Sequence, residues 1–597
     1  MSSTKREADA PPTLNESATP SKRPRTDEGP LLKTTTTTIA GSETPGGGDA
    51  PSSPFNPIET DSPSARGGGG RGGRGDQSKK GNRGKRGGRG GRGGSNSDSR
   101  SWGGRNTGKG EANMRQWGSK RDDDTAEDSN ANGQAKVEDK KDKLPKRKVA
   151  AIIGYNGIGY KGSQVNPGQD TIEGEVFKGL VKAGAISEDN STNHQKVSLA
   201  RAARTDAGVH AALNVLSLKL ILNPPDMPAE STFEEWVNSF LPPAIRLWGT
   251  VRVQGAFDPR KLCDQRQYEY TLPTHVFLAP KPASEMAKWL DKSRSTTSAT
   301  VGEGAEPQAP FTSPIIEASA QFWSNRPAES TFAEDVAAKK KWRIPHDALE
   351  QAREFVRAYE GSHNFYNFTV GKDFRDRSCQ RVMRKLEISE PFVVNDTEHV
   401  SISFLGQSFM LHQIRKMIGL TILAVRSSTP ASLVPETFGP SRIHIPKAPA
   451  LGLLLLEPQY LEYNKRVTEA NAKLEDLNKA GRLSDKDLAD QRREPLDSQG
   501  LGLKDKIDEF KTEHVYKRMR QVEEEESTFS KWLNYLDVHI GTDFEYLNPK
   551  GVIPTSATYK KGENPERPRG TAPGANESDA ALAQSDDEGA VAGEDDG

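Results

Sequence analysis

One carboxylate among arginines is the feature of this sequence that could do chemistry. Asp206 follows Arg204 by two residues, in a polar segment padded by alanines and flanked by two strand-like runs. In the second run leucines alternate with polar residues over 216–220, the pattern of a half-buried strand. A carboxylate on a loop between two strands is well placed to act as a base or nucleophile, because the scaffold fixes its position. The alternative is a surface salt bridge at a hairpin turn.

The residues around Asp206 favour the chemical interpretation. The string from Arg204 to His210, RTDAGVH, resembles the catalytic motif of the TruA-type tRNA pseudouridine synthases. The Ala-Arg-Ala-Ala in front of it is similar to the eukaryotic multisite branch of that family. The resemblance implies that Asp206 is the catalytic carboxylate. It also implies that Arg204 enters the RNA to support a flipped nucleotide and that His210 belongs to the RNA-binding residues.

A pair of tyrosines follows in a second segment, residues 257–272. Tyr268 and Tyr270 occupy alternate positions of a predicted strand, so their side chains point to one face. Two such tyrosines are normally part of a core. Preceded by Arg260 and Arg266, however, they resemble the second motif of the family. The resemblance implies that Tyr268 stacks on the target uracil and that Arg260 contacts RNA.

A buried arginine supplies the third part. Apolar residues recur at helical spacing from Phe409 to Arg426, and Arg415 lies among them. A buried charge needs an anionic partner, unless the Arg side chain reaches the surface. In the family's third motif, which residues 406–419 resemble, this Arg pairs with the catalytic Asp. The resemblance implies an Asp206–Arg415 pair, which would lower the carboxyl pKa and keep Asp206 ionised at neutral pH.

A glycine pattern at 157–162 offers a competing hypothesis. Its three glycines follow an apolar strand in the spacing of a dinucleotide-binding loop. The next residues contain Pro167-Gly168 and cannot open the helix that such a loop requires; the helix is predicted later, over 172–183. We therefore expect no dinucleotide partner. The resemblance assigns this segment to the family's opening strand, turn and helix.

The other elements follow from periodicity. Strands are predicted over 149–155, 245–253, 381–389, 399–405 and 450–460, and further helices over 233–240 and 347–359. The resemblance implies an α+β protein with the two-lobed pseudouridine synthase fold. This fold has an extended, mainly antiparallel sheet and a central basic cleft, here with a helical C-terminal extension and long disordered tails.

Composition divides the 597-residue chain. Only 33% of it is hydrophobic and the mean hydropathy is -0.77, so much of the chain lacks the apolar residues for a core. We predict a disordered, Arg-Gly-rich, RNA-contacting tail at 1–145 and the catalytic domain at 146–463. A mobile insertion is predicted within the domain at 281–341. A charged helical extension is predicted at 464–548, and a disordered acidic tail at 549–597.

The charged residues are segregated although the formal net charge is zero. Residues 66–121 hold 16 Lys and Arg against three acidic residues, a local net charge of +13. Residues 573–597 hold eight acidic residues and no basic one. Arg on a Gly-rich backbone neutralises phosphates and stacks on bases, so the basic block indicates an RNA partner. Short basic clusters at 22–25 and 146–148 lead us to expect the nucleus.

The resemblance also bears on cofactors. It implies that none is required, although similar fungal enzymes are associated with zinc. The chain has two cysteines, Cys263 and Cys379, far apart in sequence, which exclude a disulfide framework and a Cys-rich zinc module. No Cys/His cluster has ligand spacing, so a structural zinc would need dispersed ligands. No apolar run is long enough to span a membrane, and we expect no membrane partner.

The expected activity is isomerisation of uridine to pseudouridine. The resemblance to the multisite branch implies several tRNA positions in and near the anticodon stem, with small nuclear RNA and mRNA as further substrates. A monomer is favoured. The alternative from another class is a non-catalytic RNA-binding or RNA-chaperone protein that acts through its Arg-Gly repeats.

Overall fold

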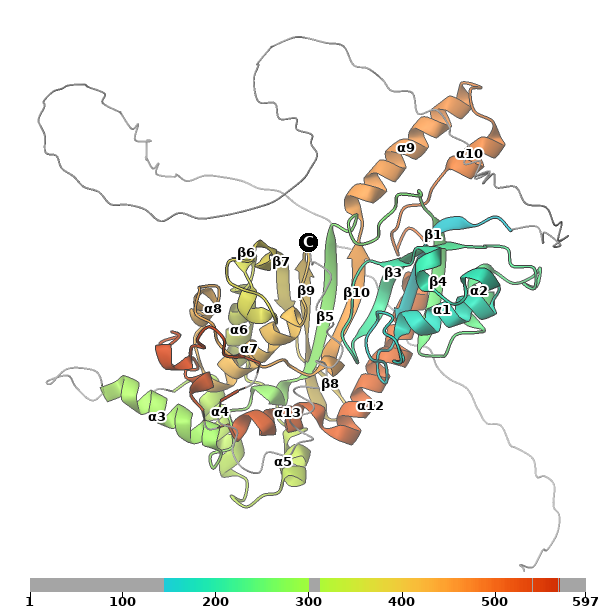
Figure 1. Cartoon of the computed structure of the whole chain (residues 1–597). Helices are drawn as coiled ribbons and strands as arrows, with labels where there is room; N and C mark the ends of the chain where they lie inside the picture. The colour runs from blue at the N-terminus through green and yellow to red at the C-terminus, as the bar shows by residue number, and fades with distance from the viewer. Residues whose placement is uncertain (1–143, 300–311, 540, 567, 570–597) are drawn as a thin grey trace, which may run out of the picture. The chain divides into compact units, whose positions relative to one another are not determined.

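A ten-stranded sheet is the frame of the computed structural model (Figure 1), which describes residues 144–299, 312–539, 541–566 and 568–569. Its main path runs β4-β1-β3-β10-β5-β9-β7-β6, with β2 beside β3 and β8 beside β9. The strands are β1 (Arg147–Tyr155), β2 (Ala200–Arg201), β3 (His210–Leu220), β4 (Ile245–Arg252), β5 (Gln265–Pro273), β6 (Gly361–Asn364), β7 (Gln380–Ile388), β8 (Phe392–Val394), β9 (Thr397–Gly406) and β10 (Leu453–Gln459). All pairings are antiparallel except that of β3 with β10, so the mainly antiparallel sheet and the mixture of helix and strand are confirmed.

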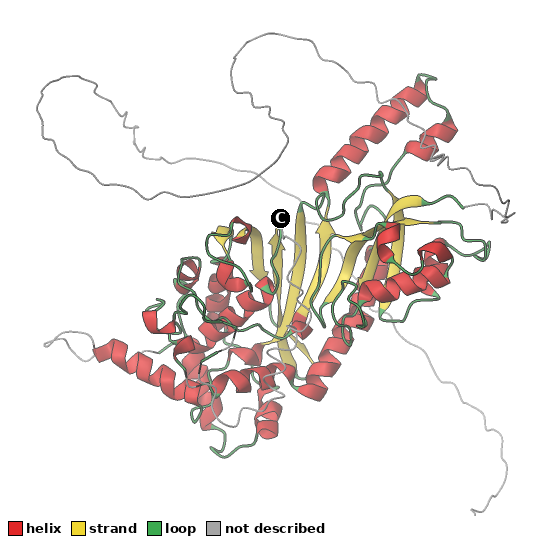
Figure 2. Ribbon diagram, viewed as in Figure 1, coloured by secondary structure: helices red, strands yellow, loops and turns green. Residues whose placement is uncertain are grey.

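Helices cover both faces of this sheet (Figure 2). In chain order they are α1 (Ile172–Lys182), α2 (Phe233–Asn238), α3 (Glu285–Ala299), α4 (Pro314–Ser324), α5 (Phe332–Lys339), α6 (His346–Arg357), α7 (Gln413–Ser427), α8 (Leu433–Thr437), α9 (Leu461–Lys479), α10 (Asp485–Gln491), α11 (Lys504–Phe510), the π-helix η7 (Lys511–Tyr516), α12 (Lys517–Glu526) and α13 (Thr528–Asp537). We call the face that packs against α1, α2, α6 and α7 the front face, and the buried residues on that side the front core. The opposite, back face packs against α9, α11, η7 and α12, and the buried residues there form the back core.

The alternation of side chains along the strands decides which residues each face receives. Tyr268 and Tyr270 of β5 belong to the front core together with Tyr155 of β1. Ile152 and Val215, from neighbouring strands, belong to the back core with Ile507 and Phe510 of α11. The period of two in β1 and β5 therefore separates the side where Tyr268 lies from the side covered by α9, α11, η7 and α12.

Two segments are more ordered than their composition predicts. The described part of the predicted mobile insertion, 281–341, forms helices α3, α4 and α5, and Leu290 and Ile315 are buried in the front core. Residues 549–569 were expected in the acidic tail, yet the described ones pack against the domain, with Tyr559 buried. In both segments a few apolar side chains, spaced among polar ones, find a place in the core.

The N-terminal tail and the acidic residues beyond 569 lie outside the described residues. The predicted helical extension is present as α9 to α13. It is less solvated than its charge indicates, because Phe529, Trp532 and Leu533 of α13 join the front core. The division into two lobes and the basic cleft between them stay predictions.

Candidate active site

The Asp206 loop lies where the two halves of the sheet join. It ends at His210, the first residue of β3, which pairs with Leu454 of β10 in the parallel register. The next residue of β10, Leu455, pairs with Tyr268 of β5. The central strand β10 therefore holds the Asp206 loop and Tyr268 at a fixed separation, although more than 60 residues divide them in sequence.

The glycine-rich turn after β1 supports this loop. The Gly157 amide donates to Nδ1 of His210 at 3.1 Å, and the Gly208 amide donates to the Tyr160 carbonyl at 3.3 Å. Ser163 and Thr205 are joined twice, because the Thr205 amide donates to Ser163 Oγ at 2.9 Å and the Ser163 amide donates to the Thr205 carbonyl at 3.1 Å. The glycine pattern that resembled a dinucleotide site is thus a cradle for Asp206.

Gly157→Ala should lower turnover by about 100-fold, since a displacement of about 1 Å at a reacting group is enough for such a loss. A Cβ at Gly157 would lie 2.1 Å from the Val209 carbonyl oxygen, so the backbone of the Asp206 loop must move. Single-turnover rates on tRNA would measure the effect. Gly255→Ala is the matched control, because a Cβ there meets nothing within 4 Å. Equal rates in both variants would show that the loop tolerates the displacement.

Asp206 is held by two side chains of the third motif, His412 and Arg415. Oδ2 lies 3.0 Å from His412 Nδ1 and 3.7 Å from Arg415 Nη1, and the Asp206 side chain is 17% exposed. Burial alone would raise the carboxyl pKa, but His412, Arg415 and Lys447 together outweigh burial and hold the pKa well below its usual value. Asp206 is therefore ionised throughout the neutral range, as predicted from the Arg415 pairing.

His412 is a site residue that sequence reasoning missed. The apolar spacing predicted a helix from Phe409, but α7 begins at Gln413, and His412 has a φ of 61° in the left-handed region. This conformation costs a residue other than glycine of order 1 kcal/mol. It directs the imidazole of His412 to Asp206 while Arg415, on the first turn of α7, approaches the same oxygen. The sequence feature that could have identified His412 is its polar side chain on an otherwise apolar helix face.

Arg415 is fixed by hydrogen bonds from both its side chain and its backbone. Its side chain is 2% exposed, and Nε donates to the Ala448 carbonyl at 2.7 Å. The backbone amide of Ala448 donates in turn to the Arg415 carbonyl at 3.0 Å. The segment that carries Lys447 and Ala448 therefore fixes the guanidinium before it meets Asp206.

Tyr268 lies on the same face of the sheet as Asp206. Its ring meets Phe409 edge to face, with centroids 5.1 Å apart, and its side chain is almost fully buried. Burial raises the pKa of the Tyr268 hydroxyl, and the nearby Asp206 charge raises it further, so the phenol is neutral. A neutral aromatic ring supported by Phe409 is suited to stacking on a base.

The three residues predicted to contact RNA differ in their exposure to solvent. Arg204 and Arg260 are exposed. His210 is 0% exposed, and its Nε2 donates to the Leu451 carbonyl at 3.2 Å while Nδ1 accepts from Gly157. Burial lowers the pKa of His210 to about 4, so the ring is neutral. Because its side chain has no exposed surface and both ring nitrogens are bonded inside the protein, His210 does not contact RNA, and we assign it to the support of the loop instead.

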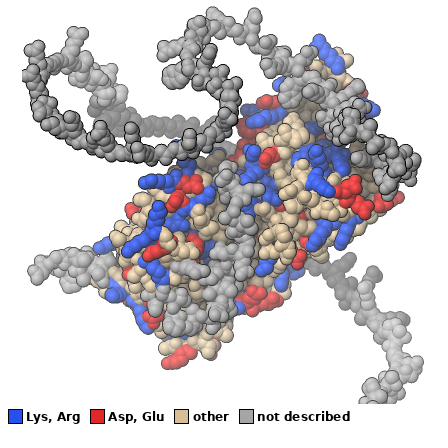
Figure 3. Space-filling model, in the orientation of Figure 1, with Lys and Arg blue, Asp and Glu red and all other residues tan. Residues whose placement is uncertain are grey.

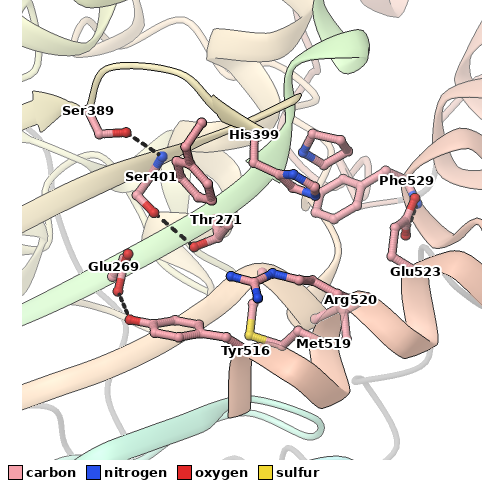
Figure 4. Close-up of a pocket in the computed structure, with 14 residues that line it drawn as sticks. Glu269, Thr271, Ser389, His399, Ser401, Tyr516, Met519, Arg520, Glu523 and Phe529 are labelled. Atoms are coloured by element: carbon pink, nitrogen blue, oxygen red, sulfur yellow. Dashed lines mark hydrogen bonds between the residues drawn. The ribbon is translucent and has the colours of Figure 1, made fainter. Parts of the chain in front are cut away.

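A cavity lies on the other face of the sheet. It has a volume of about 250 Å³ and is lined by Glu269 and Thr271, the β5 residues that alternate with Tyr268 and Tyr270. Figure 4 shows the Glu269 carboxylate accepting a hydrogen bond from the Tyr516 hydroxyl at 2.6 Å. Because side chains alternate along a strand, this cavity is separated from Asp206 by the sheet. It belongs to the packing between the sheet and α12.

The unfolding free energy should fall as the pH rises from about 4.5 to about 8, because Glu523 is protonated in the folded chain and ionised in the unfolded chain over this interval. Burial raises its pKa to about 8, against the amides of Phe529 and Thr528, which lower it. The Phe529 amide donates to Oε2 at 3.1 Å. The folded chain therefore binds a proton that the unfolded chain has released, and stability is lost as pH rises through this interval. Urea midpoints from pH 5 to 9 should change less in Glu523→Gln.

The neighbouring Glu524 provides the control, because its side chain is 55% exposed. Glu524→Gln should keep the pH dependence of the parent chain. A Glu523→Gln variant with the same pH dependence as the parent would contradict a protonated Glu523.

Two further observations concern metals and membranes. In the part of the chain that the structure describes, His, Cys, Asp and Glu side chains do not gather in groups of three that could hold a metal ion. The residues described thus provide no ligand set for the zinc that the resemblance allowed. None of the described helices combines the length and apolar character needed to cross a membrane.

Comparison with known proteins agrees with this geometry. A family model described as tRNA pseudouridine synthase matches residues 355–461. A protein named tRNA pseudouridine synthase 1 from Eremothecium gossypii is 39% identical over 69% of this chain and 77% of its own length. Its namesake from Yarrowia lipolytica is 38% identical over 69% and 79% of the two chains. A Mus musculus protein named Pseudouridylate synthase 1 homolog is 31% identical over 70% and 81%. At these identities over most of their lengths, the chain belongs to the TruA-type family of tRNA pseudouridine synthases.

Proposed function

We propose that this protein converts uridine to pseudouridine at several positions of tRNA, in and near the anticodon stem, with Asp206 as the catalytic carboxylate. The observation that carries the proposal is the ionised Asp206, fixed by His412 and Arg415 on the face where Tyr268 lies. The names of the relatives support tRNA as the substrate. Small nuclear RNA and mRNA, a nuclear location and a monomeric enzyme are parts of the same proposal.

The reaction needs only groups that this chain has. The bond between N1 and C1′ breaks, the uracil turns, C5 joins C1′, and the proton at C5 is lost while N1 gains one. Atoms and electrons balance without an oxidant or reductant, and enzymes of this family are isomerases that need no cofactor. Asp206 acts at the sugar, either as nucleophile at C1′ or as base at C2′. Its low pKa keeps it in the form that both roles require.

Positioning of the uridine is the second requirement. The base must leave its stack, which costs a few kcal/mol, roughly 2–4. Tyr268 stacks on the extruded uracil and holds it while it turns. Arg204 is exposed beside Asp206 and occupies the space that the base vacated. Lys and Arg side chains are spread over the face in Figure 3, interspersed with acidic ones, and provide contacts for the RNA backbone.

The test is turnover by the purified full chain. A tRNA transcript carrying tritium at C5 of uridine should release the label to water, and each site of release should map to a pseudouridine. Pseudouridines lost from the RNA of cells that lack the protein would identify the natural positions. RNA binding without release of tritium would refute the proposal and favour a non-catalytic RNA-binding protein.

A further inference from the structure

A carboxylate from the end of the described chain reaches helix α7 near Asp206. Oε1 of Glu566 lies 2.6 Å from Nζ of Lys416. Lys416 follows Arg415 directly, and its amide donates to the His412 carbonyl at 3.0 Å, one helical turn away. His412 and Arg415, which precede Lys416 by four residues and by one, both lie against Asp206. Glu566 is therefore bound next to the candidate active site.

Lys447 connects the two carboxylates. Its positive charge lowers the pKa of Asp206 and also that of Glu566. Lys447 thus acts electrostatically on both carboxylates, and the next residue, Ala448, is hydrogen-bonded to Arg415.

The segment that carries Glu566 is fixed on both sides. The Pro565 carbonyl accepts from Nδ1 of His444 at 2.6 Å. Further on, Nε of Arg569 donates to the buried Asp543 at 3.1 Å. Because the backbone is held at these two points, only the side chain of Glu566 must rotate to release Lys416.

Stability alone is a weak reason for such a pair. The Lys416 side chain is 2% exposed and that of Glu566 18%, so both charges are largely removed from water. The cost of desolvation cancels most of the attraction in a buried ion pair, and apolar residues of similar size are often as stable. The Lys416–Glu566 pair lies beside the candidate catalytic carboxylate, and the proposed substrate is a polyanion. A role in substrate binding therefore explains the pair better than a role in stability.

We propose that Lys416 and Lys447 form a binding site for a phosphodiester of the RNA strand next to the target uridine, and that Glu566 occupies this site as an internal competitor until RNA displaces it. The inference rests on the proposed function. A carboxylate and a phosphate oxygen make the same charge-assisted hydrogen bond to an ammonium group. Each RNA that binds must therefore compensate for the loss of the Glu566 contact.

Glu566→Gln in the full chain tests this. The variant keeps the shape of the side chain and removes its charge, so the Kd for tRNA should fall about fivefold or more. The dependence of log Kd on log salt should steepen by about one, because one more phosphate contact releases counterions without replacing an internal anion. Glu563→Gln is the matched control: it makes the same change in charge, and this exposed residue accepts only from the Lys560 amide among the described hydrogen bonds.

A second variant covers the case in which Glu566→Gln unfolds. The double change Lys416→Met with Glu566→Leu replaces the ion pair by apolar packing. It should bind tRNA more weakly than the parent chain, with an unchanged salt dependence, because in the parent the counterion released from the phosphate is offset by the one that the displaced Glu566 takes up. A chain ending at Arg569 keeps Glu566 and lacks the eight acidic residues of 573–597. Glu566→Gln should tighten binding in that chain too.

Three outcomes would overturn the inference. They are an unchanged Kd in Glu566→Gln with a lower melting temperature, a double variant that binds like the parent, and an effect that disappears in the shortened chain. The first two would assign Glu566 to structure alone, and the third would assign the competition to the acidic tail. Pseudouridine formation by the parent chain is measured in the same experiments. If the parent chain formed no pseudouridine, the proposed function would be refuted. If it formed pseudouridine and any of these outcomes occurred, only the role of Glu566 as an internal competitor would be refuted.

Discussion

Asp206→Asn should abolish pseudouridine formation while the protein still binds tRNA. The amide has the size of the carboxylate and can still accept a hydrogen bond from His412, but it cannot act as nucleophile or base at the sugar. We expect the single-turnover rate to fall by about 10⁴-fold or more. The Kd for tRNA should stay within about tenfold of the parent value, because RNA contacts come from many other groups.

The control for Asp206→Asn removes a carboxylate close by. Asp170 is exposed, and its carbonyl accepts from the Lys161 amide in the turn that cradles the Asp206 loop. Asp170→Asn should keep nearly full turnover. If Asp206→Asn turned over as fast as the parent, another group would have to be the catalytic carboxylate. If it lost tRNA binding as well as turnover, the loop would serve recognition more than chemistry.

The parts of the site that lie in contiguous motifs could be predicted. Asp206, Tyr268 and Arg415 each stand in a short stretch whose residue types fit one chemistry, and the structure places all three on one side of the sheet. The rule of charge requires only that a buried Arg have an anionic partner, and the resemblance identified that partner of Arg415 as Asp206. These predictions depended on local sequence and on the family motifs that it carries.

The missed parts depend on backbone conformation or on distant segments. Periodicity could not show that His412 takes a left-handed conformation, because the apolar spacing continues through it. Neither Lys447 nor Glu566 is near the motifs in sequence, and only the folded chain brings them to α7. His210 was misassigned for the same reason: the motif fixes its position in the loop but not its burial against Gly157 and Leu451.

Tertiary packing also explains why the described part of the insertion is helical. Its Ser, Thr, Gly and Pro content predicted mobility, but Met286, Leu290 and Trp323 are enough to bury one side of α3 and α4. A few apolar residues fix a segment when a core with complementary space already exists. Composition averaged over the segment cannot reveal this.

Arg415→Met should shift the acid limb of the rate profile to higher pH. Arg415 is one of the cations that hold the Asp206 pKa below its usual value against burial, which raises it. Without the guanidinium the pKa rises, so Asp206 becomes protonated, and inactive, at a higher pH than in the parent. In the parent, Asp206 itself should cause no loss of rate above about pH 4. At neutral pH we expect a rate about 100-fold lower, because the carboxylate also loses part of its support.

Stability should fall at the same time, since the change breaks a buried ion pair from one side. Such changes cost about 3–5 kcal/mol. Asp206 keeps His412 and some contact with water, so the lower end of this range, about 3 kcal/mol, is expected. Arg415→Lys should recover part of the charge effect, but one ammonium cannot serve the Ala448 carbonyl and Asp206 as the guanidinium does.

Arg426 separates the two effects, because it is a buried Arg on the same helix with a different anion. Its Nη1 and Nη2 bind Asp537 at 2.5 and 3.0 Å, far from the reaction. Arg426→Met should therefore destabilise the protein about as much as Arg415→Met and leave the rate profile of the folded enzyme unchanged. Rates from pH 4 to 9, measured below the melting temperature of each variant, would compare them. A shift of the acid limb in both variants, or in neither, would mean that Arg415 stabilises the fold without setting the ionisation of Asp206.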